Sequence, residues 1–103
     1  MTRVGRDAPL PTQMQGQWVD ADDSASELIV SGGEVEFRGR AVEYDYKLIE
    51  EVDGALTVSL MINDATAEDT FQRSNVTGLV ITPEGEFHAY NVKFACHLIR
   101  ANS

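Results

Sequence analysis

The stretch that decides the fold is residues 42–62, VEYDYKLIEEVDGALTVSLMI. Asp53-Gly54 lies at its centre, and this dipeptide favours a two-residue hairpin turn because both positions tolerate the positive φ that tight primed turns require. Beyond the turn, apolar residues alternate with small or polar ones from Leu56 to Ile62, a period of two that is typical of a half-buried strand. We therefore predict two antiparallel strands that meet at this turn.

The same alternation recurs along most of the chain, whereas no window keeps an apolar stripe at helical spacing for three turns. The predicted strands cover residues 14–20, 27–31, 34–48, 56–62, 70–73, 76–82, 86–90 and 92–100. Short connections join them, including a Gly32-Gly33 hairpin turn, and no helix is required. The prediction is an all-β fold, an antiparallel up-and-down meander of about eight strands closed into a small barrel, because closure removes exposed strand edges. A sandwich of the same strands is the alternative.

Two bends are expected where the apolar residues change parity. Val35 and Phe37 share one face, but the apolar set that begins at Val42 has the opposite parity, so a bulge over residues 38–41 is predicted, with Gly39 as its permissive position. A second bulge or a tight turn is expected near Asn91. Both bends favour a closed barrel over a flat sandwich.

A chain of 103 residues with 43% apolar and 24% charged residues is expected to form one domain with one core. Residues 1–12 contain Pro9 and Pro11, so they are predicted to form an extended or mobile N-terminal arm, and residues 13–103 a single β-barrel domain. No apolar run of signal-peptide length occurs, and from this we expect a cytoplasmic protein.

The formal net charge is −9, from 17 acidic and 8 basic residues, and the basic residues are scattered between Arg3 and Arg100. Nucleic acids and anionic membranes attract concentrated Lys and Arg, so neither is expected as a partner. Cys96 is the single cysteine, which excludes an internal disulfide and indicates a reducing compartment.

Residues 14–19, MQGQWV, place Gly16-Gln17-Trp18 at the start of the first predicted strand, and Arg100 ends the last one. This pair of motifs resembles the lipocalin-like (calycin) barrels. The resemblance implies that Arg100 packs over Trp18 and closes one end of the barrel, a structural cation–π contact. It also implies binding of a small, mostly apolar molecule, although some relatives are enzymes and others have filled interiors. The chain is shorter than secreted lipocalins, and it lacks their disulfides and the helix between their last strands.

Several aromatic and aliphatic side chains fall on the predicted inner face and are the candidate ligand-binding residues: Phe37, Tyr44, Tyr46, Val58, Leu60, Phe71 and Phe87. Tyrosine hydroxyls inside an apolar barrel need partners, and a ligand carbonyl or carboxylate is one. The alternative is that these rings fill the core and their hydroxyls reach water at a rim. Glu43, Asp45 and Lys47 alternate with the two tyrosines and are predicted to face outward.

No catalytic residue, metal ligand or cofactor is assigned. His88 and His97 are predicted to face outward, and their spacing of nine residues across a parity break does not define a metal site. Cys96 is interpreted as a small buried hydrophobe. The acidic run at 20–27 fails as a calcium loop, because Ala25 stands at position six and Ser31 at position twelve.

Three functions therefore stay open. The first is a lipocalin-like barrel that binds a small apolar molecule. The second is a non-catalytic oligomeric module with a filled barrel. The candidate homodimer faces are that of Thr57, Ser59 and Met61 and that of Thr77, Leu79 and Ile81. The third is a small barrel enzyme that acts on a lipophilic metabolite, which would need at least two titratable groups converging in one pocket.

Overall fold

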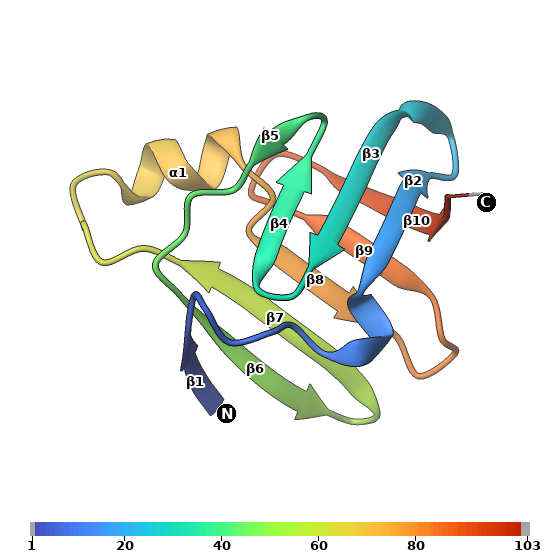
Figure 1. The fold of residues 1–103 in the computed structure, drawn as a ribbon, viewed down its shortest axis with the longest axis horizontal. Helices are drawn as coiled ribbons and strands as arrows, with labels where there is room; N and C mark the ends of the chain where they lie inside the picture. The colour runs from blue at the N-terminus through green and yellow to red at the C-terminus, as the bar shows by residue number, and fades with distance from the viewer. Residues whose placement is uncertain (1, 102–103) are drawn as a thin grey trace.

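The computed structural model describes residues 2–101, which form one strongly curled antiparallel sheet of ten strands (Figure 1). The strands are β1 (Thr2–Gly5), β2 (Gly16–Asp20), β3 (Asp23–Ser31), β4 (Glu34–Phe37), β5 (Arg40–Ala41), β6 (Tyr46–Val52), β7 (Ala55–Met61), β8 (Gly78–Ile81), β9 (Phe87–Tyr90) and β10 (Ala95–Arg100). Their order in the sheet is β1-β6-β7-β8-β9-β10-β2-β3-β4-β5. The predicted all-β antiparallel class is confirmed. The sheet is a half-barrel, because β1 and β5 are its two edges and do not pair with each other.

The Asp53-Gly54 turn is confirmed. Both residues have positive φ, 52° and 86°, and Val52 pairs with Ala55 on either side of them. From this turn β6 and β7 pair over their full length, and β8 continues the meander beside β7.

The predicted bulge at residues 38–41 is wrong, because these residues make a second hairpin turn. Arg38 and Gly39 have φ of 55° and 81°, and Phe37 pairs with Arg40 across them. One long strand is thereby replaced by β4 and the short edge strand β5. Near Asn91 the structure has the tight-turn form of the prediction, since Tyr90 pairs with Ala95 around a four-residue loop.

The predicted strand at residues 70–73 is also wrong, because these residues belong to helix α1 (Glu68–Ser74). Only Phe71 of this segment is buried. The segment therefore lacks the alternating apolar side chains that would pack a strand against the core. Pairs four residues apart stabilise the helix instead: Gln72 donates to Glu68, and Arg73 forms an ion pair with Asp69. In Figure 1 α1 lies at the end of the molecule beside β5.

The N-terminal segment runs along the sheet. β1 pairs with β6 at one edge, a short 3₁₀ turn (η1, Thr12–Met14) precedes β2, and the Leu10 side chain is buried. The backbone of residues 6–8 passes so close to Gly33 that a Cβ there would lie 2.2 Å from the Arg6 carbonyl oxygen. Gly33 is therefore required by this close approach, whereas its neighbour Gly32 supplies the positive φ of the hairpin.

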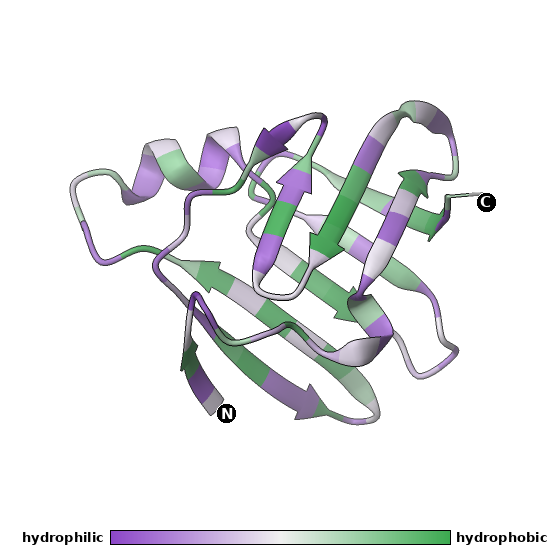
Figure 2. Cartoon of the chain, viewed as in Figure 1, coloured by the Kyte–Doolittle hydropathy of each residue, from purple (hydrophilic) through white to green (hydrophobic). Residues whose placement is uncertain are grey.

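The core occupies the concave side of the sheet. Alternate residues point into it, as Leu28 and Val30 of β3 and Val58 and Leu60 of β7 illustrate. Figure 2 shows the corresponding alternation of hydrophilic and hydrophobic residues along β4. Among residues 2–101, no helix has the length and apolar character needed to cross a membrane.

The predicted parity of the strand before the Asp53-Gly54 turn is wrong at Tyr46 and Lys47. The segment between β5 and β6 is irregular: the Tyr44 amide donates to the Val42 carbonyl, and the Asp45 amide donates to Met61. As a result Lys47, expected on the surface, is completely buried, while Tyr46 lies outside the core beneath the Arg3 guanidinium, 4.0 Å from its ring centroid.

Arg6, Tyr44 and Lys47 form what we call the Lys47 cluster, which joins the N-terminal segment to the rest of the sheet. The Lys47 ammonium donates to the carbonyls of Gly5 and Arg6, at 2.8 and 3.2 Å, and to the Tyr44 hydroxyl at 3.0 Å. The Tyr44 hydroxyl donates to the Gly33 carbonyl, and Arg6 forms an ion pair with Glu34. Side chains thus bridge the region between β6 and β4 that no strand pairing covers.

The Gly-x-Trp segment and the last strand meet as the resemblance implied. The Arg100 guanidinium lies 3.9 Å from the centroid of the Trp18 ring and donates to the Gln15 carbonyl. Gly16 has a φ of 117°, and a Cβ there would lie 2.3 Å from the Arg100 Nη1 atom. The glycine of this motif therefore makes room for the arginine, and Trp18 also packs edge-on against Phe87.

Candidate functional site

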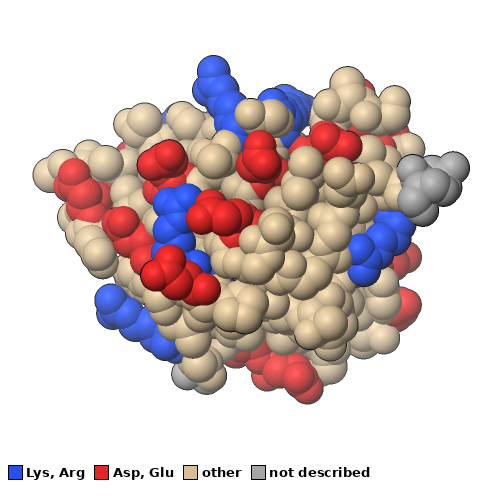
Figure 3. Space-filling view, viewed as in Figure 1, with Lys and Arg blue, Asp and Glu red and all other residues tan. Residues whose placement is uncertain are grey.

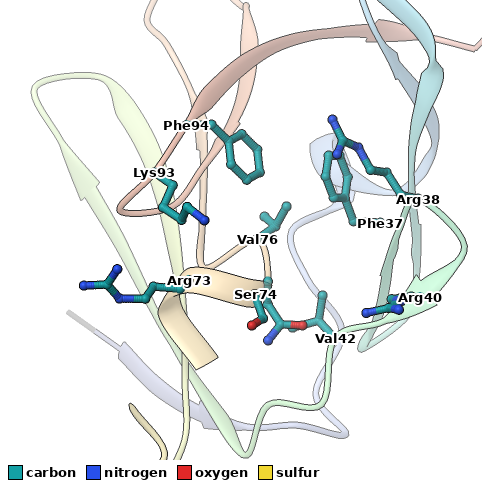
Figure 4. Close-up of a pocket in the computed structure, with 10 residues that line it drawn as sticks. Phe37, Arg38, Arg40, Val42, Arg73, Ser74, Val76, Lys93 and Phe94 are labelled. Carbon is teal, nitrogen blue, oxygen red and sulfur yellow. The ribbon is translucent and has the colours of Figure 1, made fainter. Parts of the chain in front are cut away.

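A cavity of about 400 Å³ opens between three pieces of the chain: the β4–β5 hairpin, the end of α1 and the β9–β10 loop (Figure 4). Its lining combines cationic, aromatic, aliphatic and small polar side chains. The lining residues are Phe37, Arg38, Arg40, Val42, Arg73, Ser74, Asn75, Val76, Lys93 and Phe94.

The β4–β5 hairpin supplies the first wall. Because the turn has only two residues, it holds Phe37 and Arg40 directly opposite each other. Arg38 is held by a hydrogen bond from its Nε to the Ser26 hydroxyl at 3.0 Å, and its guanidinium lies 5.2 Å from the Phe37 ring centroid. In Figure 4 the Arg40 side chain lies next to Val42 on the same wall of the cavity.

Asn91 shapes the second wall. Its Oδ1 atom accepts hydrogen bonds from the backbone amides of Lys93 and Phe94, at 2.7 and 3.0 Å, which fixes the loop between β9 and β10. Its Nδ2 atom donates to the Asn75 carbonyl at 2.9 Å. One side chain therefore ties the loop that carries Lys93 and Phe94 to the segment that follows α1.

The end of α1 supplies the third wall. Asn75 ends the helix, with its backbone amide and its Nδ2 both donating to the Phe71 carbonyl. Phe71 anchors the helix in the core, so Ser74 and Asn75 are presented at the cavity from a fixed position. Arg73 is paired with Asp69, and in Figure 4 it points away from the centre of the cavity.

The charge of this cavity is opposite to that of the protein. Four of the eight basic residues line it, and none of its ten lining residues is acidic although the chain has 17 acidic residues. By contrast, acidic side chains are spread across the face shown in Figure 3. Within residues 2–101, no carboxylate lies within ion-pair distance of Arg38, Arg40 or Lys93. These cations are therefore available to an anionic ligand.

Two aromatic rings form the apolar part of the cavity. Phe37 and Phe94 are stacked, with ring centroids 5.8 Å apart and planes inclined by 16°. Phe94 keeps 36% of its surface exposed, and the buried side chains of Val42 and Val76 lie at the base. A flat apolar group can pack on these rings while an anionic substituent reaches the neighbouring cations.

The seven residues predicted to bind a ligand do not come together in this cavity. Only Phe37 lines it. Val58, Leu60, Phe71 and Phe87 are core residues, each at most 8% exposed. The two tyrosines separate, Tyr44 into the Lys47 cluster and Tyr46 to the place beneath Arg3.

Sequence reasoning missed the cationic lining, since Arg38, Arg40, Arg73 and Lys93 are dispersed over 56 positions of the chain, from 38 to 93. The Arg38-Gly39-Arg40 segment was the one feature of the sequence that could have indicated these cations. Recognised as a turn, it would have placed two arginines at one hairpin tip.

Burial changes the acidity of groups outside the cavity. Desolvation raises the pKa of the Tyr44 phenol and of the Cys96 thiol above their usual values, and it lowers the pKa of Lys47. Cys96 packs against the core, so its thiol is kept protonated and weakly nucleophilic.

One group of side chains in the described part of the chain can hold a metal ion. Glu86, His88 and His97 place one potential ligand atom each within 4.8 Å of the others. The sequence spacing had argued against such a site, but the β9–β10 hairpin sets the two histidines directly opposite each other.

Comparisons of this chain with protein-family models, with curated proteins and with solved structures find no match.

Proposed function

We propose that this protein binds a small molecule that carries a flat apolar group and an anionic group, such as a carboxylate or sulfonate, in the cavity between α1, the β4–β5 hairpin and the β9–β10 loop. The observation that carries the proposal is the gathering of four of the eight basic residues of an acidic chain around one pair of stacked rings. Three of them, Arg38, Arg40 and Lys93, have no carboxylate partner within residues 2–101. Small-molecule binding was the function expected from the sequence. The proposed site is this cavity in place of the inner face predicted from the sequence, and the proposed ligand is amphiphilic.

The cations account for the anionic part of the ligand. Arg40 lies at one side of the cavity and Lys93 points into it from the other (Figure 4), and both lack a carboxylate partner in residues 2–101. A bound carboxylate or sulfonate would accept charge-assisted hydrogen bonds from both, which are stronger than hydrogen bonds between neutral groups. The net charge of −9 favours selectivity, since an anion is repelled over the acidic surface and attracted only where the basic groups gather.

The rings account for the apolar part. An aromatic ligand that packs against Phe37 and Phe94 removes apolar surface from water, and Val42 and Val76 close the base. A cavity of about 400 Å³ is in the size range of small-molecule sites. The resemblance to lipocalin-like barrels, carried by Gly16, Trp18 and Arg100, supports the same class of function.

A matched pair of fluorescent probes tests the proposal. 8-Anilinonaphthalene-1-sulfonate carries the anion, and N-phenyl-1-naphthylamine is its neutral counterpart. We expect one site for the sulfonate and binding of the neutral probe about tenfold weaker, a difference of roughly 1.4 kcal/mol for the anion. The double variant Arg40→Gln/Lys93→Gln should reduce sulfonate affinity by about tenfold and leave the neutral probe unaffected.

Arg3→Gln is the matched control, because it removes a cation that lies over Tyr46 and away from the cavity. It should leave both probes unchanged. Raising the salt concentration from about 0.05 to about 0.5 M should weaken only the sulfonate, since the cations are exposed to solvent. Equal affinity for both probes, or full sulfonate binding in the double variant, would refute the cationic site and place binding on an apolar surface elsewhere.

A further inference from the structure

The chain contains two histidines, and the fold makes them cross-strand neighbours. His88 of β9 pairs in register with His97 of β10, and their imidazole rings are stacked with centroids 4.9 Å apart. Both face away from the core, because Phe87 and Ala89 on either side of His88 are buried, as is Leu98 next to His97. This outer face is separate from the cavity, which is lined by the loop residues at the other end of the hairpin.

Glu86 completes the group. Its carboxylate oxygen Oε1 lies 3.3 Å from the His88 Nε2 atom. The backbone of Glu86 is fixed by two hydrogen bonds with Thr82 across the Pro83-Glu84-Gly85 turn: its amide donates to the Thr82 hydroxyl at 3.1 Å, and its carbonyl accepts from the Thr82 amide at 2.8 Å. The carboxylate is thereby held beside the imidazole pair.

The distances suit a tetrahedral transition-metal ion. With metal–ligand bonds of about 2.0–2.1 Å, two ligands of tetrahedral zinc lie about 3.3 Å apart. The separation between Glu86 and His88 already has this value, and all three ligand atoms lie within 4.8 Å of one another. The His97 nitrogen would have to move closer to reach the same ion, and rotation about its side-chain torsions is the movement required.

We propose that Glu86, His88 and His97 bind one divalent transition-metal ion, of which zinc is the best match, on the outer face of β9 and β10. Two imidazoles and a carboxylate are donors that zinc accepts, whereas magnesium and calcium prefer an all-oxygen shell. Three protein ligands leave a fourth position for water. The ion also links two adjacent strands, so its binding should raise the thermal stability of the folded chain.

The test uses the untagged protein with ZnCl₂, followed by calorimetry and by the imidazole resonances in NMR spectra. The chain has only two histidines, and the His88→Gln and His97→Gln variants assign each set of imidazole resonances to its residue. We expect one zinc ion per chain, both imidazole rings shifting with the same saturation curve, and no response to MgCl₂ or CaCl₂. CoCl₂ should give the visible absorption of tetrahedral cobalt.

Substitutions define the ligands. His88→Gln and His97→Gln should each lower zinc affinity by about tenfold or more, and Glu86→Gln by a smaller factor. Glu84→Gln is the matched control for loss of an acidic residue in the same turn, and Cys96→Ala tests the thiol on the opposite face; both should bind zinc as the wild type does. A zinc concentration of about 1 mM is far above the dissociation constants of structural zinc sites. Wild-type imidazole resonances that do not shift at this concentration would overturn the proposal. So would undiminished affinity in a folded His97→Gln variant.

Discussion

The Lys47 cluster and the cationic cavity both combine cations with aromatic rings, but they use the cations differently. In the cluster, Lys47 is completely buried, and its ammonium has three acceptors, the carbonyls of Gly5 and Arg6 and the Tyr44 hydroxyl. In the cavity, Arg40 and Lys93 are exposed and have no carboxylate partner within residues 2–101. Both regions contain cations and aromatic rings. They differ in whether the hydrogen-bond donors of the cations already have acceptors within the protein.

This difference separates structural from binding roles. A buried charge with every donor occupied can be removed only by leaving its acceptors unsatisfied, so it contributes to stability. Exposed cations around apolar rings contribute little to folding and keep their capacity for a ligand. Substitutions in the Lys47 cluster should therefore lower the stability, whereas substitutions in the cavity should weaken ligand binding and leave the stability nearly unchanged.

The largest contrast is expected between two phenylalanines. Phe87→Ala removes a buried ring that packs on Trp18 and should lower the free energy of unfolding by about 3–5 kcal/mol. Phe94→Ala removes a partly exposed ring and should cost less than about 1 kcal/mol, yet it should weaken the naphthalene sulfonate because it removes half of the stacked pair. Urea denaturation and probe titration measure the two effects. Unchanged probe affinity in the Phe94→Ala variant would contradict a binding role for the stacked rings.

A smaller contrast is expected between the two lysines. Lys47→Met keeps the bulk of the side chain but leaves the Gly5 and Arg6 carbonyls without their donor, and it should lower the free energy of unfolding by about 2 kcal/mol. Lys93→Met should change stability by at most about 0.5 kcal/mol, because this side chain is on the surface. Chemical denaturation of both variants is the measurement. Equal stabilities of the two variants would show that the Lys47 cluster is not a structural element.

The smallest effect is the pH dependence that the buried Lys47 ammonium adds to the stability. Burial lowers its pKa in the folded state below the ordinary 10.5, so between these two values the unfolded chain binds more protons than the folded one. Its contribution therefore makes the free energy of unfolding rise with pH in that window. Burial raises the pKa of Tyr44 above 10.0, and that contribution has the opposite sign above pH 10.

Subtracting the stability of Lys47→Met from that of the wild type at each pH isolates the lysine. The difference should increase from neutral pH toward 10.5. A difference that falls over this range would mean that the Lys47 ammonium is better stabilised in the folded protein than in water.

The turn chemistry and strand class could be predicted from the sequence, because Asp53-Gly54 and the period-two alternation after it are local signals. The bend at residues 38–41 was located correctly, but its nature was not, since a bulge and a two-residue hairpin both reverse parity. Lys47 was misplaced because the irregular segment before Tyr46 shifts parity without a glycine or proline to mark it.

The candidate sites depended on contacts that local patterns do not encode. The cationic cavity needs three segments whose proximity follows from the order of strands in the sheet. The pairing of His88 with His97 depends on the register of one hairpin, and the loop length set by Asn91 decides it. The contact between Trp18 and Arg100 could be predicted only from the resemblance to a family, because no local pattern in the sequence indicates it.

The most direct test of the cavity as the binding site is to map bound 8-anilinonaphthalene-1-sulfonate by intermolecular NOEs. We expect contacts from the naphthalene ring to Phe37 and Phe94 and to the methyl groups of Val42 and Val76, with the sulfonate next to Arg40 and Lys93. Contacts to Val58, Leu60 and Phe87 instead would place the ligand in the barrel interior and contradict it.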